Sequence, residues 1–257
     1  MDLRLNWVAF KTLVIKEFIR VIRIWLQTIV PPAITMTLYF IIFGSLIGRR
    51  IGNMGGYDYM QYIAPGRIMM SVITNSYGNV VSSFFGAKFA RHIEEMMVSP
   101  MSNATIIMGH VAGGVIRGLL VGAMVTLVAL GFTRLEVQHP LITLSMVVLS
   151  SIIFSLAGFI NAVFARTFDD ISIIPTFVLT PLTYLGGVFY SISLLPEVWQ
   201  KVSLLNPILY MVNAFRYGIL GTSDIDIAHA YLIVALFIGG LFSASMILMN
   251  RGIGMRE

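Results

Sequence analysis

Residues 141–165 read LITLSMVVLSSIIFSLAGFINAVFA, twenty-five residues without a charged side chain. As an α-helix this run is about 37 Å long, which exceeds the roughly 30 Å of hydrocarbon in a bilayer. Five further apolar runs are predicted to span the membrane, at about 25–47, 62–85, 105–132, 171–189 and 230–249. The predicted fold class is therefore all-α and integral to the membrane, with six transmembrane helices.

The composition of the 257 residues agrees with a membrane protein: 57% are hydrophobic, 11% are charged, and the mean hydropathy is +0.86. Six spans and their loops occupy nearly the whole chain, so we predict one transmembrane domain over 1–257 without a separate catalytic domain. The chain has no cysteine, which removes disulfides and thiolate chemistry. The net charge of +5 is not gathered in a basic run, so we interpret it as a topology signal rather than as nucleic-acid binding.

The first segment, residues 3–24, is interrupted by charged side chains and lacks the apolar core of a signal peptide. Lys16, Arg20 and Arg23 recur at helical spacing, opposite an apolar face that includes Trp7. This pattern predicts a basic amphipathic helix in the membrane interface. An ordinary helix packed on a soluble neighbour is the alternative.

Lysine and arginine are unevenly divided between the two sides of the predicted topology. One side carries Lys11, Lys16, Arg20, Arg23, Lys88, Arg91, Arg166, Arg251 and Arg256. The other side carries Arg49, Arg50, Arg134, Lys201 and Arg216. Because basic residues are enriched on the cytoplasmic side of membrane proteins, we predict that both termini are cytoplasmic.

Few ionisable residues fall inside the predicted spans. Arg67, His110 and Arg117 do, and they are functional candidates because a charge at a helix centre costs about 2.5–3.5 kcal/mol. For Arg67 the alternative is snorkelling to the outer interface, and for Arg117 it is a guanidinium satisfied by carbonyls in a subunit interface. Every carboxylate lies in a predicted loop or terminal segment, which argues against a proton-coupled or sodium-coupled carrier.

The run 105–132 carries glycines at four-residue spacing. They are Gly109, Gly113, Gly114, Gly118 and Gly122. Small residues in this pattern let helix backbones approach closely, so we predict tight packing around this helix. The chain has no phosphate-loop, zinc-protease or nucleophile-elbow motif, and we therefore predict no catalytic, metal or cofactor site of its own.

Residues 88–100 read KFARHIEEMMVSP and combine both charge signs with apolar residues. Ile93 and Met96 fall on one face of a short predicted helix, which Pro100 ends. From the residues alone, a solvated loop helix and a helix that docks on a partner are equally good explanations. Further along, residues 190–226 hold two apolar pieces too short to cross, which predicts a re-entrant or interfacial segment.

Over nearly its full length the chain resembles the membrane subunits of ABC-2 type ABC exporters, most nearly small single-domain permeases and nodulation-type exporters. The resemblance rests on RIWLQTIVPPAITMTLYFIIFG at 23–44, FFGAKFARHIEEMMVSP at 84–100, and the segment 168–221, which begins FDDISIIPTF. After Pro65 and Gly66 the family leads us to expect an aliphatic residue, and Arg67 departs from that pattern.

The resemblance implies that 3–24 is an elbow helix, that 88–100 is a coupling helix seated on a separate ATP-binding cassette subunit, and that 194–216 holds external re-entrant helices. It assigns the ATPase-coupling role to Lys88, Arg91, Glu94, Glu95, Met96, Pro100, Phe168, Asp169 and Asp170. It also implies a homodimer in the lipid of the bacterial inner membrane, with two copies of the partner that hold ATP and Mg.

We expect such a permease to move a hydrophobic or amphipathic, drug-like or lipid-like substrate outward between two copies of the chain. The candidate pathway or interface residues are Tyr39, Phe43, Tyr77, Arg117, Phe177 and Tyr184. A lipid-linked saccharide or a polysaccharide is the alternative cargo. The alternative from another class is an ATP-independent channel or ion-coupled carrier that uses Arg67, His110 and Arg117.

Overall fold

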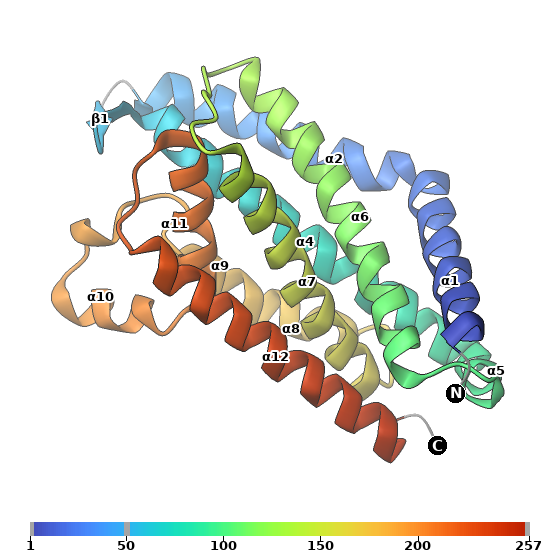
Figure 1. Cartoon of the computed structure of the whole chain (residues 1–257). Helices are drawn as coiled ribbons and strands as arrows, with labels where there is room; N and C mark the ends of the chain where they lie inside the picture. Colours follow the sequence, from blue (N-terminus) through green and yellow to red (C-terminus); the bar gives the residue numbers. More distant parts are fainter. Residues whose placement is uncertain (1–2, 49–51, 255–257) are drawn as a thin grey trace.

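The computed structural model describes residues 3–48 and 52–254, and its centre is the long helix α4 (Tyr59–Phe89). Helices α6 (Asn103–Leu130) and α7 (Pro140–Phe164) pack along α4 and against each other, as Figure 1 shows. The apolar run that begins at Leu141 forms α7. The prediction of an all-α membrane protein is confirmed at this level.

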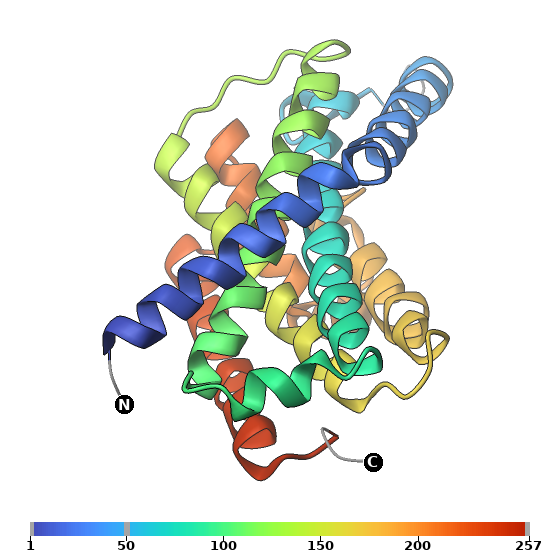
Figure 2. The same cartoon turned by 90° about the vertical axis from the view of Figure 1, so that its right-hand side faces the viewer.

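Three further helices cover this central group. Helices α11 (Pro207–Leu220) and α12 (Ile227–Arg251) pack on α7, and α1 (Leu3–Arg23) crosses α6 obliquely (Figure 2). The Asn103 side chain donates to Asn250 Oδ1 at 2.8 Å, which joins the start of α6 to the end of α12. Figure 1 shows that the first turn of α1 lies at this same end of the molecule.

The opposite end of the molecule holds a two-stranded antiparallel hairpin of β1 (Asn53–Met54) and β2 (Tyr57–Asp58), in which Asn53 faces Asp58 and Met54 faces Tyr57. Gly55 and Gly56 form its turn with φ of 60° and 86°, values that glycine adopts without strain. The carboxylate of Asp58 then accepts from Met60 N at 3.2 Å and caps α4. The hairpin thus fixes where α4 begins.

Four of the described helical segments are long and apolar enough to cross a membrane, judged by length and composition. They are Trp25–Gly44, Asn103–Leu130, Pro140–Phe164 and Ile227–Arg251. Helix α4 is longer than any of these, at 31 residues or about 46 Å, but it is more polar. Its neighbours bury most of its surface, including the polar side chains of Ser76, Asn79 and Ser83.

Two segments wind more widely than an α-helix. Helix α2 (Trp25–Tyr39) continues through Pro31 and Pro32 and then widens into the π-helix η1 (Phe40–Gly48). The second runs through α8 (Asp170–Ile174), the π-helix η2 (Pro175–Leu179) and α9 (Thr180–Leu185). Proline lacks the amide N–H that an α-helix needs, so Pro175 and Pro181 favour such irregular winding in the second segment.

The segment between α9 and α12 divides into an exposed part and a buried part. The exposed part comprises the short 3₁₀ turn η3 (Ile192–Leu194) and the amphipathic helix α10 (Glu197–Leu204). Helix α11 is buried, and it includes Arg216, which donates to the carbonyls of Tyr62 and Gly187 at 3.3 and 2.6 Å. Arg216 was counted with the loop charges, but it lies in the core. Of the other residues in the charge count, Arg49, Arg50 and Arg256 lie outside the described residues.

The glycines of α6 lie where its neighbours come closest. A Cβ on Gly109 or Gly113 would lie 2.7 Å from the Cβ of Leu13 or Glu17 on α1. On the other face, a Cβ on Gly114 or Gly118 would collide with serine hydroxyls of α4 and α7. The predicted close packing is therefore found, and it joins helices of a single chain.

Candidate functional site

The candidate coupling segment lies where the chain leaves α4. Arg91 adopts φ 60° and ψ 10°, and it is the one non-glycine residue with positive φ in the part of the chain that the structure describes. This conformation ends α4 and turns the chain directly into the short helix α5 (His92–Val98). Ser99 is extended, as the residue before a proline prefers, and it ends α5 at Pro100. Helix α5 is therefore set across the end of the longest helix.

Helix α5 presents an exposed surface of mixed character. Ile93 is its buried anchor and Met96 packs partly on the core. The side chains of Glu94, Glu95, Met97 and Val98 are exposed, with Val98 at 88%. Two carboxylates beside exposed apolar side chains are suited to contact with a protein that carries basic and apolar residues.

Lys88 forms hydrogen bonds within the chain, between α4 and the end of α7. Its ammonium group donates to the carbonyls of Val163 and Ala165, both at 2.8 Å. These carbonyls lie at the C-terminal end of α7, where a cation is favourable because backbone acceptors there lack helical partners. Lys88 therefore ties α4 to α7, a contact that its place in the predicted coupling set did not anticipate.

The turn between α7 and α8 is also joined to α4. Phe168 packs on Phe85 and Phe89, with ring centroids 5.0 and 5.1 Å apart. Asp170 accepts from the backbone N–H groups of Arg166 and Thr167 at 2.8 and 2.9 Å. These donors, that of Arg166 first, hold the pKa of the Asp170 carboxyl below its ordinary value. The neighbouring Asp169 is exposed.

A hollow of about 340 Å³ brings these segments together. Its lining includes Lys88, Arg91 and Glu94 from the first segment, Arg166 from the second, and Gly254 after α12. Two stretches of sequence some 70 residues apart thus form one surface at the end of the molecule where α1 begins.

The predicted elbow helix α1 is anchored by a buried ion pair. The carboxylate of Glu17 is fully buried, lies 2.9 Å from Arg20 Nη2, and accepts from the Ser83 hydroxyl. Arg20 also donates to Asn79 Oδ1 at 2.8 Å, whereas Lys16 and Arg23 are exposed. Sequence reasoning placed Glu17 in a terminal segment and missed its burial. A signal existed: Leu13, Glu17 and Val21 recur every fourth residue on the face that packs inward.

Three of the aromatic pathway candidates meet around Arg67, together with Phe189, which was not predicted. The Arg67 guanidinium lies 4.3 Å from the ring centroid of Tyr39 and 5.6 Å from that of Phe189. Phe43 stacks on Tyr39 at 4.3 Å, and Tyr184 stacks on Phe189 at 5.4 Å. We call these four rings the aromatic cage. Its position depends on Gly66, because a Cβ there would collide with the Val188 backbone.

The remaining candidates lie elsewhere. Phe177, on η2, is 73% exposed. Tyr77 is buried against α7, so it is not accessible to cargo in this conformation, contrary to expectation. Arg117 donates to Asn75 Oδ1 at 3.4 Å, a side-chain contact rather than the carbonyl contacts considered for it. His110 is buried, with Nδ1 3.1 Å from the Ile106 carbonyl, as a packed histidine would be.

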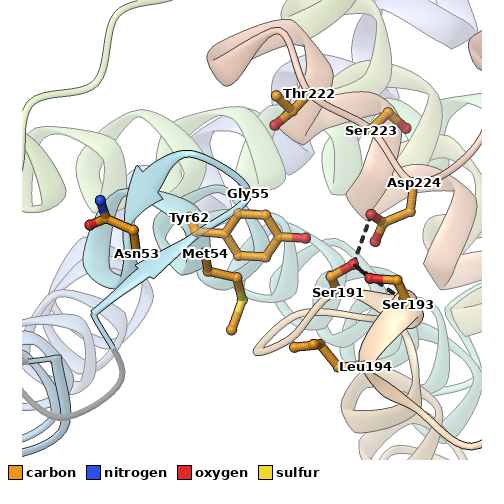
Figure 3. A pocket seen from close by; sticks show the side chains of 10 residues that line it. All are labelled: Asn53, Met54, Gly55, Tyr62, Ser191, Ser193, Leu194, Thr222, Ser223 and Asp224. Carbon is orange, nitrogen blue, oxygen red and sulfur yellow. Dashed lines mark hydrogen bonds between the residues drawn. The ribbon is translucent and has the colours of Figure 1, made fainter.

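A separate pocket of about 450 Å³ opens at the hairpin end of the molecule, and sequence reasoning missed it. Figure 3 shows Asp224 and Ser191 on one side and Tyr62 with the hairpin on the other. The carboxylate of Asp224 accepts from the Ser191 hydroxyl at 2.8 Å and from Ile192 N at 3.1 Å. Its residues come from three distant segments, so no local motif marks it. The Asp224 carboxylate already accepts hydrogen bonds from within the chain, so it offers fewer free acceptors to a ligand.

Across residues 3–48 and 52–254, the structure shows no group of three or more histidine, aspartate or glutamate side chains placed to hold a metal ion. The polar clusters described above pair arginine or lysine with amides, carbonyls, aromatic rings or a carboxylate, or pair aspartate with backbone N–H groups and a serine hydroxyl. They are arrangements that position helices and recognise charge.

Comparison with known proteins identifies the family. Residues 8–220 match the family described as ABC-2 type transporter. The chain is 56% identical to the inner membrane transport permease YadH of Escherichia coli strain K12 over 255 residues, which are 99% of this chain and 100% of that protein. It is 23% identical to nodulation protein J of Rhizobium leguminosarum bv. trifolii, over 96% of this chain and 94% of that protein. With its apolar helices, the chain is a bacterial inner-membrane transport permease of the ABC-2 type transporter family.

Proposed function

We propose that this chain is the membrane subunit of an ATP-driven exporter and that α5 transmits motion from a separate ATP-binding cassette subunit. ABC-2 permeases generally work with such a subunit, which supports this proposal. The observation that carries it is α5 itself, an exposed helix with two carboxylates set by a left-handed residue across the end of α4. ATP and Mg are bound by the partner.

In the proposed assembly two copies of the chain pair with two copies of the ATPase. Six segments cross the membrane: α2 with η1, α4, α6, α7, the segment from α8 to α9, and α12. Helix α1 lies in the interface as an elbow helix, and the segment with η3, α10 and α11 is external. Both termini are cytoplasmic, on the side of α5. The cargo is hydrophobic or amphipathic, and it moves outward between the two copies.

The proposed mechanism depends on the direct connection of α5 to the continuous helix α4. Closure of the ATPase dimer pushes on α5 and on the neighbouring Asp169 turn. Because α4 is continuous over 31 residues, displacement of its inner end tilts the whole helix. The winding of η1 and η2 differs from that of an α-helix, and such turns are places where flanking segments change direction.

The first test is affinity purification from native membranes in mild detergent, with mass spectrometry of the bound proteins and an assay of ATP hydrolysis. We expect a stoichiometric ATPase. Transport by the purified chain in vesicles without ATP or partner would instead establish the channel or carrier alternative.

A charge-reversal variant then tests the role of α5. The double variant Glu94→Lys and Glu95→Lys should lose the bound ATPase while the permease remains folded in the membrane. The matched control is Glu136→Lys, which reverses an exposed carboxylate between α6 and α7 at the opposite end. If the double variant still binds the ATPase and the complex still hydrolyses ATP as the wild type does, α5 is not the surface that contacts the ATPase.

A further inference from the structure

Between Arg67 and Ser82, helix α4 has one accessible face, and apart from Met70 and Gly78 its residues there have polar side chains. The residues on it that are exposed or half-buried include Arg67, Ser71, Thr74, Asn75, Gly78 and Ser82. Except for the adjacent pair Thr74 and Asn75, neighbours in this set are three or four residues apart, which places them on one side of an α-helix. The remaining surface of α4 is mostly buried against α6, α7 and α11. We call this face the polar stripe.

The polar stripe is an unsuitable surface for lipid. Polar side chains that face hydrocarbon are costly, and an arginine at such a place costs several kcal/mol unless water or a polar partner reaches it. At Arg67 the stripe lies beside Tyr39 of α2 and Phe189, which follows α9. A polar face flanked by apolar, exposed segments is expected to line a path rather than to face the bilayer.

Two guanidinium groups on this path lack a counter-ion. The only ion pairs among the described residues are Glu17 with Arg20 and Asp226 with His229. Arg67 lies on the stripe, and Arg117 reaches it by donating to Asn75. Asn75 and Arg67 are eight residues apart on α4, or about 12 Å. The path therefore carries two arginines without a counter-ion among the described residues, and at its other end Ser82 accepts from Arg20, whose charge is paired with the buried carboxylate of Glu17.

The aromatic cage orients the Arg67 guanidinium but leaves most of its N–H groups without a hydrogen-bond acceptor in the described structure. This guanidinium lies over the rings of Tyr39 and Phe189, and the one acceptor for it in the described structure is the Met70 sulfur, 3.4 Å from Nη1. Thioether sulfur is a weak acceptor, and Arg67 Nε is buried without a partner. Guanidinium donors in a fixed plane are matched to a carboxylate, phosphate or sulfonate.

From these observations we propose that the cargo is an anionic amphipathic molecule, that Arg67 binds its anionic group, and that the cage rings contact its apolar part. The inference rests on the proposed export function and narrows its cargo class. Arg67 is then a specificity-determining residue, and the polar stripe is the path that the anionic group follows past Arg117.

The test measures binding to the full chain alone, in nanodiscs of phosphatidylcholine at pH 8, without any ATPase. The probes are dodecanoic acid carrying a fluorescent nitrobenzoxadiazole group on its tail and the methyl ester of the same molecule, which is neutral. We expect the acid to bind about tenfold more tightly than the ester. Arg67→Met should remove this preference, and Arg67→Lys should keep part of it. The control, Arg251→Met, removes an exposed charge at the end of α12 and should keep all of it.

A second measurement does not depend on the folding of any variant. Dodecanoic acid with a diazirine on its tail is photo-crosslinked to the wild-type chain, and labelled peptides are mapped by mass spectrometry. Label on the peptides that hold Phe43, Met70 and Phe189 supports the site, and label confined to other peptides overturns it. Equal binding of acid and ester to the wild type, or an undiminished preference in Arg67→Met, also overturns it.

The outcomes separate this inference from the proposed function. A preference for the acid that depends on Arg67, in a chain with no ATPase partner, would retain the site and remove the exporter proposal. If the chain binds an ATPase but shows no preference for the acid over the ester, the exporter proposal stands and the Arg67 site is wrong. If Arg67→Met changes the oligomeric state without changing the preference, Arg67 serves contact between copies and the inference is wrong.

Discussion

The two sides of this molecule are built differently. On the packed side, the glycines of α6 lie directly against side chains of α1, α4 and α7, so a larger residue at Gly109, Gly113, Gly114 or Gly118 would collide with them. On the open side, α2 with η1 and the segment from α8 to α9 include wide turns and expose large apolar residues. These residues are Ile34, Leu38, Ile41, Ile42, Ile173, Ile174, Phe177, Val178 and Tyr184.

The difference indicates which part of the permease is fixed and which part changes contacts. Small residues in contact leave a packed helix no alternative arrangement without a collision. Exposed apolar residues on irregular helices can pair with a second copy, with lipid or with cargo. We therefore expect the packed side to move as one body and the open side to rearrange around it.

The largest expected effect comes from breaking the packed side. Gly114→Leu places a side chain where the Ser155 hydroxyl and Val80 already lie. Overpacking of this kind should lower the melting temperature in detergent by about 5–10 °C or prevent recovery of folded protein. Gly239→Leu is the matched control, because nothing lies within 4 Å of its Cβ position. Equal melting temperatures for the two variants would contradict the packed-side assignment.

A smaller effect is expected where α1 joins the packed side. Glu17→Gln removes the charge that pairs with Arg20 and weakens the bond from Ser83. Since Arg20 is partly exposed, the loss should be about 2 kcal/mol, below that for a fully buried pair, and seen as a melting temperature about 4–8 °C lower. Lys11→Gln, an exposed change on the same helix, should have no measurable effect. If both variants melt like the wild type, the ion pair does not anchor α1.

The open side should tolerate a change that alters pairing but not folding. Phe177→Asn replaces a 73% exposed ring, and we expect self-association in lipid vesicles, measured by energy transfer between labelled copies, to weaken about tenfold. The melting temperature should stay within about 2 °C of the wild type. Leu236→Asn, at a similarly exposed position on α12, is the control and should leave association unchanged. Equal weakening in both variants would mean that pairing is not confined to the open side.

The smallest effect is expected at the turn that joins the two sides. The folded pKa of Asp170 is lowered by the backbone donors of Arg166 and Thr167, so its stabilising effect is present above the unfolded carboxyl pKa and is lost as the pH falls through the folded value. Asp170→Ala should lower the melting temperature by no more than about 2 °C at pH 7, with the difference shrinking below about pH 4. A difference that grows on acidification would contradict this account.

Much of the fold could be predicted because hydrophobic length and spacing are local properties. The length of the apolar run that begins at Leu141 was enough to predict a membrane helix. The four-residue spacing of the glycines in α6 predicted close contact with a neighbouring helix. The segment Lys88–Pro100 was predicted as one short helix ended by its proline. Its first two residues instead belong to α4, and α5 covers only His92–Val98. Its docking role remains a proposal.

The sequence alone determined that this chain is a membrane permease of a known family and where its apolar helices lie, because both depend on the order of residues along the chain. Only the tertiary structure decided that Glu17 is buried, that Lys88 caps α7, and that Arg67 lies over the rings of Tyr39 in α2 and Phe189 after α9. These contacts join residues 28 to 122 positions apart. Local sequence patterns do not record which helices become neighbours, since that depends on the packing of the whole bundle.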